Sequence, residues 1–338
     1  MSSNHKSSHA QWGSRVGFIL AATGSAVGLG NIWKFPYMTG QSGGSAFVLT
    51  YLLCIAFIGL PILVAEWLIG RRGQKNPIHA MEDVAQQNRR SKAWKLVGVS
   101  GVLGSFLILS FYSGIGGWAV DYIFITASGA FNGMDGKATE SLFTGFLGNP
   151  SQLLTWHSIF MLLTVVIVAM GVSGGSERAS SLMMPPLALL LLVLVAYGAF
   201  FTNSFGAAAA YLFSPNWSAI NGTVILAALG HAFFTLSLGM GIMMAYGSYL
   251  GQEVNLLKTA RTVVILDTVI ALVAGLAIFP LVFAHHLEPS AGPGLIFITL
   301  PIAFGNMTGG TLLGVLFFIL LTFAALTSSI SLLEPTVE

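Results

Sequence analysis

The chain alternates long apolar stretches with shorter polar ones. Eight apolar stretches approach the roughly 20 residues that an α-helix needs to cross a bilayer core. None shows the alternating pattern in ~10-residue units that is typical of an outer-membrane barrel. The pattern therefore predicts an all-α membrane protein, a multi-span helical bundle. Its expected spans are at about 15–37, 44–70, 97–125, 155–172, 181–201, 223–250, 259–284 and 310–334.

Two of these stretches are interrupted in the middle. The first interruption is TGSAVGLGNIWKFPY at 23–37, and the second is GHAFFTLSLGMG at 230–241. A bilayer core holds no water for unpaired backbone groups, so irregular backbone there persists only beside protein or a polar cavity. Breaks in the first and sixth spans are typical of a five-plus-five inverted repeat, whose broken helices hold substrate and ions. The alternative is a pair of Gly-rich helices that pack closely on their neighbours.

The inverted repeat also divides the chain. We expect a single transmembrane transporter domain at 1–338, with a first repeat at about 12–201 and a partial second repeat at about 223–338. The first repeat contains five spans and the second only three. The second repeat is therefore expected to be incomplete, as in a chain truncated after about eight helices.

Composition and charge agree with a membrane protein and suggest its orientation. Only 8% of residues are charged, against about 25% in soluble proteins, and the mean hydropathy is +0.81. Seven of the fourteen Lys and Arg residues fall within 71–96. By the positive-inside rule, this loop and the amino terminus are expected on the cytoplasmic side of a plasma (bacterial inner) membrane. The net charge of +2 gives no indication of nucleic-acid binding.

A few ionisable residues fall inside apolar stretches, where burial of a charge is costly. Asp267 has apolar neighbours on both sides, so a bound cation would keep it charged, whereas an unpaired carboxylate would take up a proton. Glu66 is expected to accept N–H bonds from an unwound neighbour, and Asp121 to be a solvated helix-end residue. His231 is either a packed histidine or a proton carrier. No HExxH motif or nucleophile–base pattern indicates an enzyme.

Five motifs occur in order along the chain: WGSRVGFILAATGSAVGLGNIWKFPY, GGSAFVLTYLL, GLPILVAEWLIGRRG, GHAFFTLSLGMG and LTSSISLLEP. With these motifs, and with the right numbers of helices between them, the chain resembles the neurotransmitter:sodium symporter family. The resemblance is to its bacterial sodium-dependent amino acid transporters in particular, and it covers Trp12 to Pro335.

The resemblance implies two sodium sites as the cofactor sites of the protein. The first would consist of Ala26, Asn31, Thr235 and Asp267 with the substrate carboxylate. The second would consist of backbone oxygens of Gly24 and Val27 with Ala324, Thr327 and Ser328. Trp12 and Lys34 would belong to the gates, whose partners would lie beyond residue 338.

The resemblance also implies an amino acid site between the two breaks. Its residues would be Ser25, Ala26, Gly28, Leu29, Gly30, Ile108, Tyr112, Phe234, Thr235, Ser237, Met240, Ser328 and Leu332. The substrate carboxylate would meet the N–H groups near Leu29 and Gly30 and the hydroxyl of Tyr112. Phe234 and Tyr112 would form a lid on the outer side.

Several positions suggest what the site accepts. Monoamine transporters of the family carry an Asp where this chain has Gly28, so Gly28 points to an amino acid. Ile108, Met240 and Leu332 favour a hydrophobic or aromatic side chain, because Met is flexible enough to pack around a large group.

One further position bears on ion dependence. Chloride-dependent members carry an Asn where this chain has Asp267, and a Ser one turn later, where it has Ala271. A fixed carboxylate can supply the negative charge of chloride, so transport is expected to be chloride-independent. The implied function is sodium-coupled symport of an amino acid by alternating access across the lipid bilayer. The alternatives are a non-transporting or channel-like membrane protein of the same fold, or an inactive truncated fragment.

Overall fold

The computed structural model describes residues 11–287 and 292–338, and within these ranges the regular structure is helical. The α-helices are α1 (Arg15–Ala26), α2 (Phe35–Gln41), α3 (Ser45–Cys54), α4 (Leu60–Gly73), α5 (Pro77–Gln87), α6 (Lys95–Ala127), α7 (Gly136–Leu147), α8 (Pro150–Ala169), α9 (Arg178–Phe201), α10 (Phe205–Phe213), α11 (Gly222–Thr235), α12 (Ile242–Ser248), α13 (Leu256–Ala284), α14 (Leu300–Gly305) and α15 (Gly310–Val337). Turns of π-helix lie at Gly30–Lys34, Ile55–Gly59, Val172–Glu177 and Leu295–Thr299. The predicted all-α fold is confirmed.

Within the described residues, six continuous helical stretches are long and apolar enough to cross a membrane. They are Ser45–Gly73, Lys92–Ala127, Pro150–Ala169, Val172–Phe201, Leu256–Ala284 and Gly310–Val337. The first predicted span is a bent pair, Arg15–Ala26 and Gly30–Gln41, with a 45° angle between its halves. The predicted span 223–250 is divided into α11 and α12, which have 14 and 7 residues. Neither half is long enough to cross a bilayer alone.

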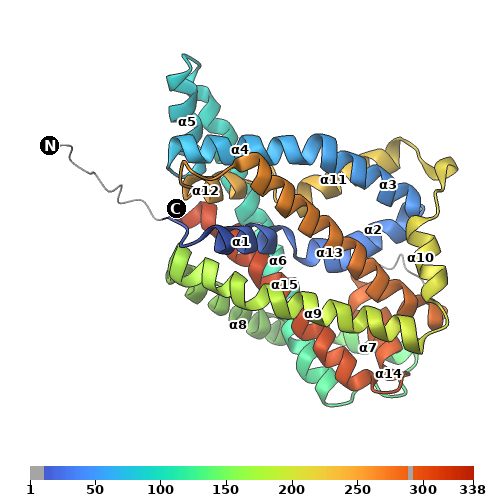
Figure 1. Ribbon diagram of the computed structural model, residues 1–338. Coiled ribbons are helices and arrows are strands. Elements are labelled where there is room, and N and C mark those ends of the chain that lie inside the picture. The colour runs from blue at the N-terminus through green and yellow to red at the C-terminus, as the bar shows by residue number, and fades with distance from the viewer. Residues whose placement is uncertain (1–10, 288–291) are drawn as a thin grey trace.

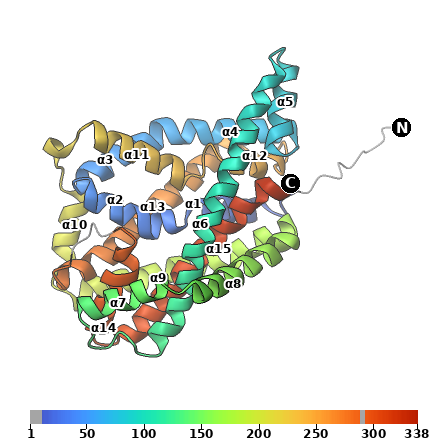
Figure 2. The same ribbon diagram turned by 180° about the vertical axis from the view of Figure 1, so that it is seen from behind.

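The helices form a bundle around α1, α13 and α15, which lie at its centre (Figure 1). α4 and α11 cover one side of these helices, and α8 and α9 cover the other. Seen from behind, the long α6 crosses α15, against which it packs (Figure 2). α5 and the last turn of α15 lie at one end of the bundle, which we name the basic end. α7, α10 and α14 lie at the opposite end.

Three stretches between the predicted spans contain helices that the apolar pattern did not reveal. α5 lies between the second and third spans, α7 between the third and fourth, and α10 between the fifth and sixth. α5 and α7 begin with a side-chain cap: Asn76 accepts from the N–H of His79, and Asp135 accepts from the N–H of Ala138. The broken apolar stretch 285–309 also contains a short helical segment, Leu295–Gly305, which packs against α7, α13 and α15.

Candidate functional site

Each broken helix is interrupted where left-handed or glycine-rich backbone ends the regular helical hydrogen bonding. α1 ends at Ala26, and the chain resumes as a π-turn in which the N–H groups of Asn31 and Ile32 share the carbonyl of Gly28. Between α11 and α12 the φ angles of Ser237, Gly239 and Gly241 are 54°, 76° and 73°. Such angles end a helix and free its terminal N–H and C=O groups for other partners.

Glu66 of α4 accepts a hydrogen bond from one of these freed N–H groups. Its Oε1 atom accepts a hydrogen bond of 2.7 Å from the N–H of Gly239, in the break between α11 and α12. The glutamate is buried, and an unpaired N–H at this depth would be costly. The predicted role of Glu66, to accept an N–H from an unwound neighbour, is confirmed.

Asp267 lies at the junction of the two breaks and is fully buried. Its Oδ1 atom accepts from Asn31 Nδ2 at 2.8 Å and from Thr235 Oγ1 at 3.0 Å, and its Oδ2 atom accepts from Tyr51 at 3.3 Å. Thr235 Oγ1 also lies 3.3 Å from Asn31 Oδ1. The oxygen atoms of this cluster therefore belong to a carboxylate, an amide and hydroxyls. Oxygen ligands of this kind suit a hard cation.

Tyr51, on α3, is the member of this cluster that the sequence interpretation missed. Its hydroxyl contacts the carboxylate of Asp267 across 216 residues of sequence. The sequence did contain a sign of this cluster, because the polar residues Thr50 and Tyr51 interrupt an otherwise apolar stretch. That signal does not reveal the partner, which only the tertiary fold brings into contact.

His231 lies beside this cluster but not within it. Its ring packs against Phe35, Phe47 and Tyr51, with centroid distances of 5.8, 5.7 and 5.1 Å. Within the described residues, neither ring nitrogen has a hydrogen-bond partner. The geometry thus favours a packed histidine over a proton carrier.

A second group of oxygens lies between α1 and α15. Thr327 Oγ1 is 3.4 Å from the carbonyl of Val27 and 3.1 Å from that of Ala324. Ser328 Oγ lies 3.3 Å from the carbonyl of Ser25. A Cβ added at Gly24 would meet the side chain of Thr327 at 3.3 Å, so the small residue permits this close approach. The residues predicted for a second cation site are thus brought together.

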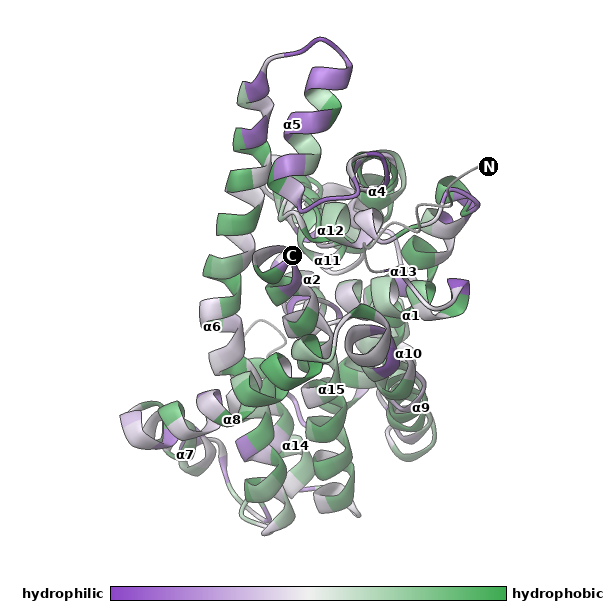
Figure 3. Ribbon diagram, turned by 90° about the vertical axis from the view of Figure 1, so that its left-hand side faces the viewer, coloured by the Kyte–Doolittle hydropathy of each residue, from purple (hydrophilic) through white to green (hydrophobic). Residues whose placement is uncertain are grey.

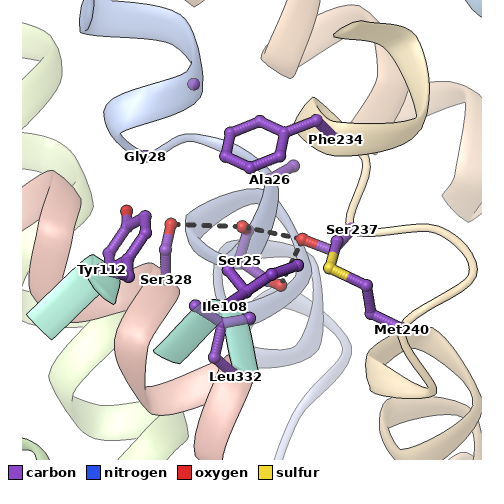
Figure 4. Close-up of a pocket in the computed structure, with 11 residues that line it drawn as sticks. Ser25, Ala26, Gly28, Ile108, Tyr112, Phe234, Ser237, Met240, Ser328 and Leu332 are labelled. Atoms are coloured by element: carbon purple, nitrogen blue, oxygen red, sulfur yellow. Dashed lines mark hydrogen bonds between the residues drawn. The ribbon is translucent and has the colours of Figure 1, made fainter. Parts of the chain in front are cut away.

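The predicted substrate residues surround a single buried cavity (Figure 4). Eleven residues line it: Ser25, Ala26, Gly28, Gly30, Ile108, Tyr112, Phe234, Ser237, Met240, Ser328 and Leu332. Leu29 and Thr235 adjoin it without lining it. The side chains leave about 20 Å³ between them, which is the room of about one water. A larger molecule therefore requires side chains to move, and the flexible Met240 is suited to do so.

The cavity lining combines polar and apolar residues. Ser237 Oγ donates to the carbonyl of Ser25, and the N–H of Leu29 donates to the hydroxyl of Tyr112 at 3.2 Å. A Cβ at Gly28 would lie 2.1 Å from Ser328 Oγ and 2.9 Å from the hydroxyl of Tyr112. Only glycine therefore fits at position 28 in this arrangement.

The two predicted gate residues, Lys34 and Trp12, make contacts on opposite sides of the cavity region. Towards the opposite end, the Nζ atom of Lys34 lies 3.9 Å from the ring centroid of Phe234, a cation–π contact above the cavity. Towards the basic end, Trp12 Nε1 donates to the carbonyl of Tyr246 at 3.1 Å. Glu177, which the sequence interpretation did not single out, accepts from Gly13 N at 2.7 Å and from Ser14 Oγ at 2.9 Å.

One expectation about charge is wrong. Asp121 was expected to be solvated, but only 4% of its surface is exposed. Its Oδ2 atom accepts a hydrogen bond of 2.8 Å from Gln152 of α8. The residue lies at the end of an apolar stretch, yet α7 and α8 return over that end and cover it.

Comparisons with known proteins agree with this architecture. The sequence matches the sodium:neurotransmitter symporter family over residues 9–132 and 146–338. It is 44% identical over 324 residues to the uncharacterized sodium-dependent transporter YhdH of Bacillus subtilis (strain 168), covering 96% of this chain and 71% of the relative. An uncharacterized sodium-dependent transporter of Haemophilus influenzae is 36% identical over 341 residues, covering 99% of this chain and 74% of the relative.

The fold is also similar to the crystal structure of MhsT in complex with L-phenylalanine. The TM-score is 0.89 and the identity 48%, over 97% of this chain and 74% of that chain. A helical bundle with two broken helices around a central cavity is typical of secondary transporters. The chain belongs to the sodium:neurotransmitter symporter family. It is a multi-pass membrane protein of a family of sodium-coupled transporters rather than of enzymes.

Proposed function

We propose that this protein transports a hydrophobic or aromatic amino acid together with sodium ions, by alternating access. The observation that carries the proposal is the position of Asp267. Its buried carboxylate contacts Asn31 in the first break and Thr235 at the end of α11. These two residues directly follow Gly30 and Phe234, which line the central cavity. A cation here would be shared between the protein and a ligand in the cavity.

The first proposed sodium site is built around Asp267, Asn31, Thr235 and the backbone of Ala26. A buried carboxylate without a cationic partner is costly, and sodium would compensate its charge. The hydrogen bonds from Asn31 and Tyr51 fix the orientation of the carboxylate. Asn31 also presents its amide oxygen to the same space.

The second proposed sodium site uses only neutral oxygens. Carbonyls of Gly24, Val27 and Ala324 would join the hydroxyls of Thr327 and Ser328. The support is the close approach of α1 and α15, with Thr327 Oγ1 within 3.4 Å of two of these carbonyls. Together with the first site, this would give two sodium ions for each amino acid site.

The amino acid would place its carboxylate against the turn at Gly28–Gly30. The hydroxyl of Tyr112 already contacts the N–H of Leu29 there, and Gly28 leaves room that a Cβ would fill. The same carboxylate would complete the shell of the first sodium, so that each ligand strengthens the binding of the other. Phe234 and Tyr112 would then close over the substrate.

The apolar part of the cavity lining supports a hydrophobic or aromatic side chain. Ile108, Met240 and Leu332 contribute to it, together with Phe234. The similar structure, MhsT, was crystallised with L-phenylalanine. We therefore take L-phenylalanine as the first substrate to test.

We further propose that transport does not require chloride and that the amino terminus is cytoplasmic. Asp267 supplies a fixed negative charge beside the first sodium site, and Ala271 offers no hydroxyl to an anion. The orientation follows from the basic residues of 71–95, which lie at the same end as Arg15.

Counterflow in proteoliposomes tests the function. Vesicles preloaded with unlabelled phenylalanine should take up labelled phenylalanine saturably in sodium and not in potassium. A channel of the same fold would give linear, non-exchanging flux and would overturn the proposal. Replacement of chloride by gluconate should leave the rate unchanged, and a large loss would contradict chloride independence.

A further inference from the structure

A second site of different chemistry lies at the basic end, between α4, α5 and the start of α6. Seven basic residues lie between residues 71 and 95, against two acidic ones, Glu82 and Asp83. The hairpin of α5 and α6 projects beyond the bundle, with a hydrophilic turn at its tip and a hydrophobic α6 below (Figure 3). Neither the cavity nor the gates described above use these residues.

An open groove runs along one face of α5. It has a volume of about 250 Å³ and is lined by Ile69, Met81, Val84, Ala85, Asn88, Arg90 and Trp94. Four of these positions, 81, 84, 85 and 88, follow the three- and four-residue spacing of a single helix face. The wall is almost wholly apolar, although Asn88 and Arg90 are among the residues that form it.

Arg90 brings an unused positive charge to this groove. The ion pair of this region lies elsewhere, between Lys75 and Asp83 at 2.5 Å. Within residues 11–287 and 292–338, no carboxylate lies within 4 Å of the Arg90 guanidinium, and the residue is exposed. Arg90 can therefore offer its planar group to a phosphate, which it binds through two parallel hydrogen bonds.

The surroundings of the groove are those of a membrane surface. Trp94, Leu96 and Leu68 are 51%, 62% and 41% exposed although they are large and apolar. In a multi-pass protein, such residues face lipid, and Trp is enriched at the level of the headgroups. At a membrane surface, this groove would offer an apolar slot to an acyl chain, with the exposed Arg90 beside it for a headgroup.

We propose that this groove binds one anionic phospholipid, with its phosphodiester at Arg90 and an acyl chain along Met81 and Val84. Clusters of basic residues next to a membrane helix attract anionic lipid, and five net positive charges in 71–95 supply that attraction. The apolar wall would contact an acyl chain, which a soluble anion does not have. The site therefore selects a charged lipid rather than free phosphate or a neutral lipid.

Native mass spectrometry of the purified chain tests this site. Phosphatidylglycerol and phosphatidylcholine with identical acyl chains are added in equal amounts, and we expect the phosphatidylglycerol adduct to dominate about five-fold or more, from roughly one basic contact. Arg90→Gln should remove that preference. Val84→Trp should also remove it by filling the groove without changing charge.

Arg89→Gln is the matched control, because Arg89 has the same charge and lies next to Arg90 but does not line the groove. It should retain most of the preference. Equal losses in the Arg89 and Arg90 variants would overturn the site in favour of diffuse attraction. Equal binding of both lipids, or a Val84→Trp variant that keeps the preference, would also overturn it. Circular dichroism of each variant confirms that the helices remain folded.

Discussion

The two proposed sodium sites sit on either side of the same break in α1, yet they are built from different chemistry. The site at Asp267 contains a carboxylate held by three side-chain donors from different helices. The site at Thr327 contains a hydroxyl and backbone carbonyls. In the proposed function, the carboxylate would strengthen sodium binding at the first site and the substrate would share that ion, whereas the second site would depend on how closely α1 and α15 approach.

Asp267→Ala should have the largest effect on sodium binding, and it should act on the first site. It removes the charge of the first site and the carboxylate that accepts from Tyr51, and it leaves Asn31 Nδ2 with only the main-chain carbonyl of residue 267. Loss of a buried charged partner costs about 3–5 kcal/mol, so sodium affinity should fall at least ~100-fold. Sodium-dependent binding of labelled phenylalanine measures the loss. An Asp267→Ala protein with unchanged sodium dependence would place the first ion elsewhere.

Gly28→Ala should have the next largest effect, because it changes the turn at which we propose that the substrate carboxylate binds. The new Cβ would meet Ser328 Oγ at 2.1 Å. Overpacking of this kind costs about 1–3 kcal/mol, so phenylalanine affinity should fall about thirty-fold. Gly104→Ala, where an added Cβ has nothing within 4 Å, is the matched control. Equal binding by both variants would show that the turn is not at the substrate.

Thr327→Val should have a smaller effect and should act on the second site alone. The change keeps the shape of the side chain and removes one oxygen near the carbonyl of Val27. One such contact contributes about 1.5 kcal/mol, so half-maximal transport should need about ten-fold more sodium. Thr322→Val, which removes a hydroxyl bonded only to its own helix, provides the control. If both variants behave alike, the second site is not at Thr327.

Lys34→Gln should have the smallest effect, because it touches the lid and neither ion. A cation–π contact contributes about 0.5–1 kcal/mol, so the dissociation rate of phenylalanine should rise about three-fold. Lys137→Gln, which changes an exposed lysine of α7, should leave the rate unchanged. Stopped-flow release of labelled substrate measures the rate.

The positions of the two breaks could be predicted from sequence because their cause is local. Gly239, Gly241 and the Gly24–Gly30 run mark backbone that a regular helix disfavours. Glu66 could be predicted as well, since a lone carboxylate in an apolar stretch needs donors. For each of these residues, the neighbouring sequence alone is enough to predict the structural feature.

Other features depend on contacts between distant segments, which the apolar pattern does not contain. Tyr51 reaches Asp267 only because α3 packs beside the break in α11. Asp121 is buried only because α8 brings Gln152 over the end of α6. Glu177 holds Gly13 and Ser14 across more than 160 residues. The ion and substrate residues were named through the family resemblance, and the fold brings them together.

The most direct test of sodium coupling is an equilibrium titration of phenylalanine binding at increasing sodium, with the purified protein. If the substrate carboxylate completes the first sodium site, phenylalanine affinity should rise at least ten-fold from sodium-free to saturating buffer. Sodium affinity should rise by the same factor with phenylalanine present, because coupling of this kind is reciprocal. A phenylalanine affinity that does not change with sodium would contradict the shared site at Asp267.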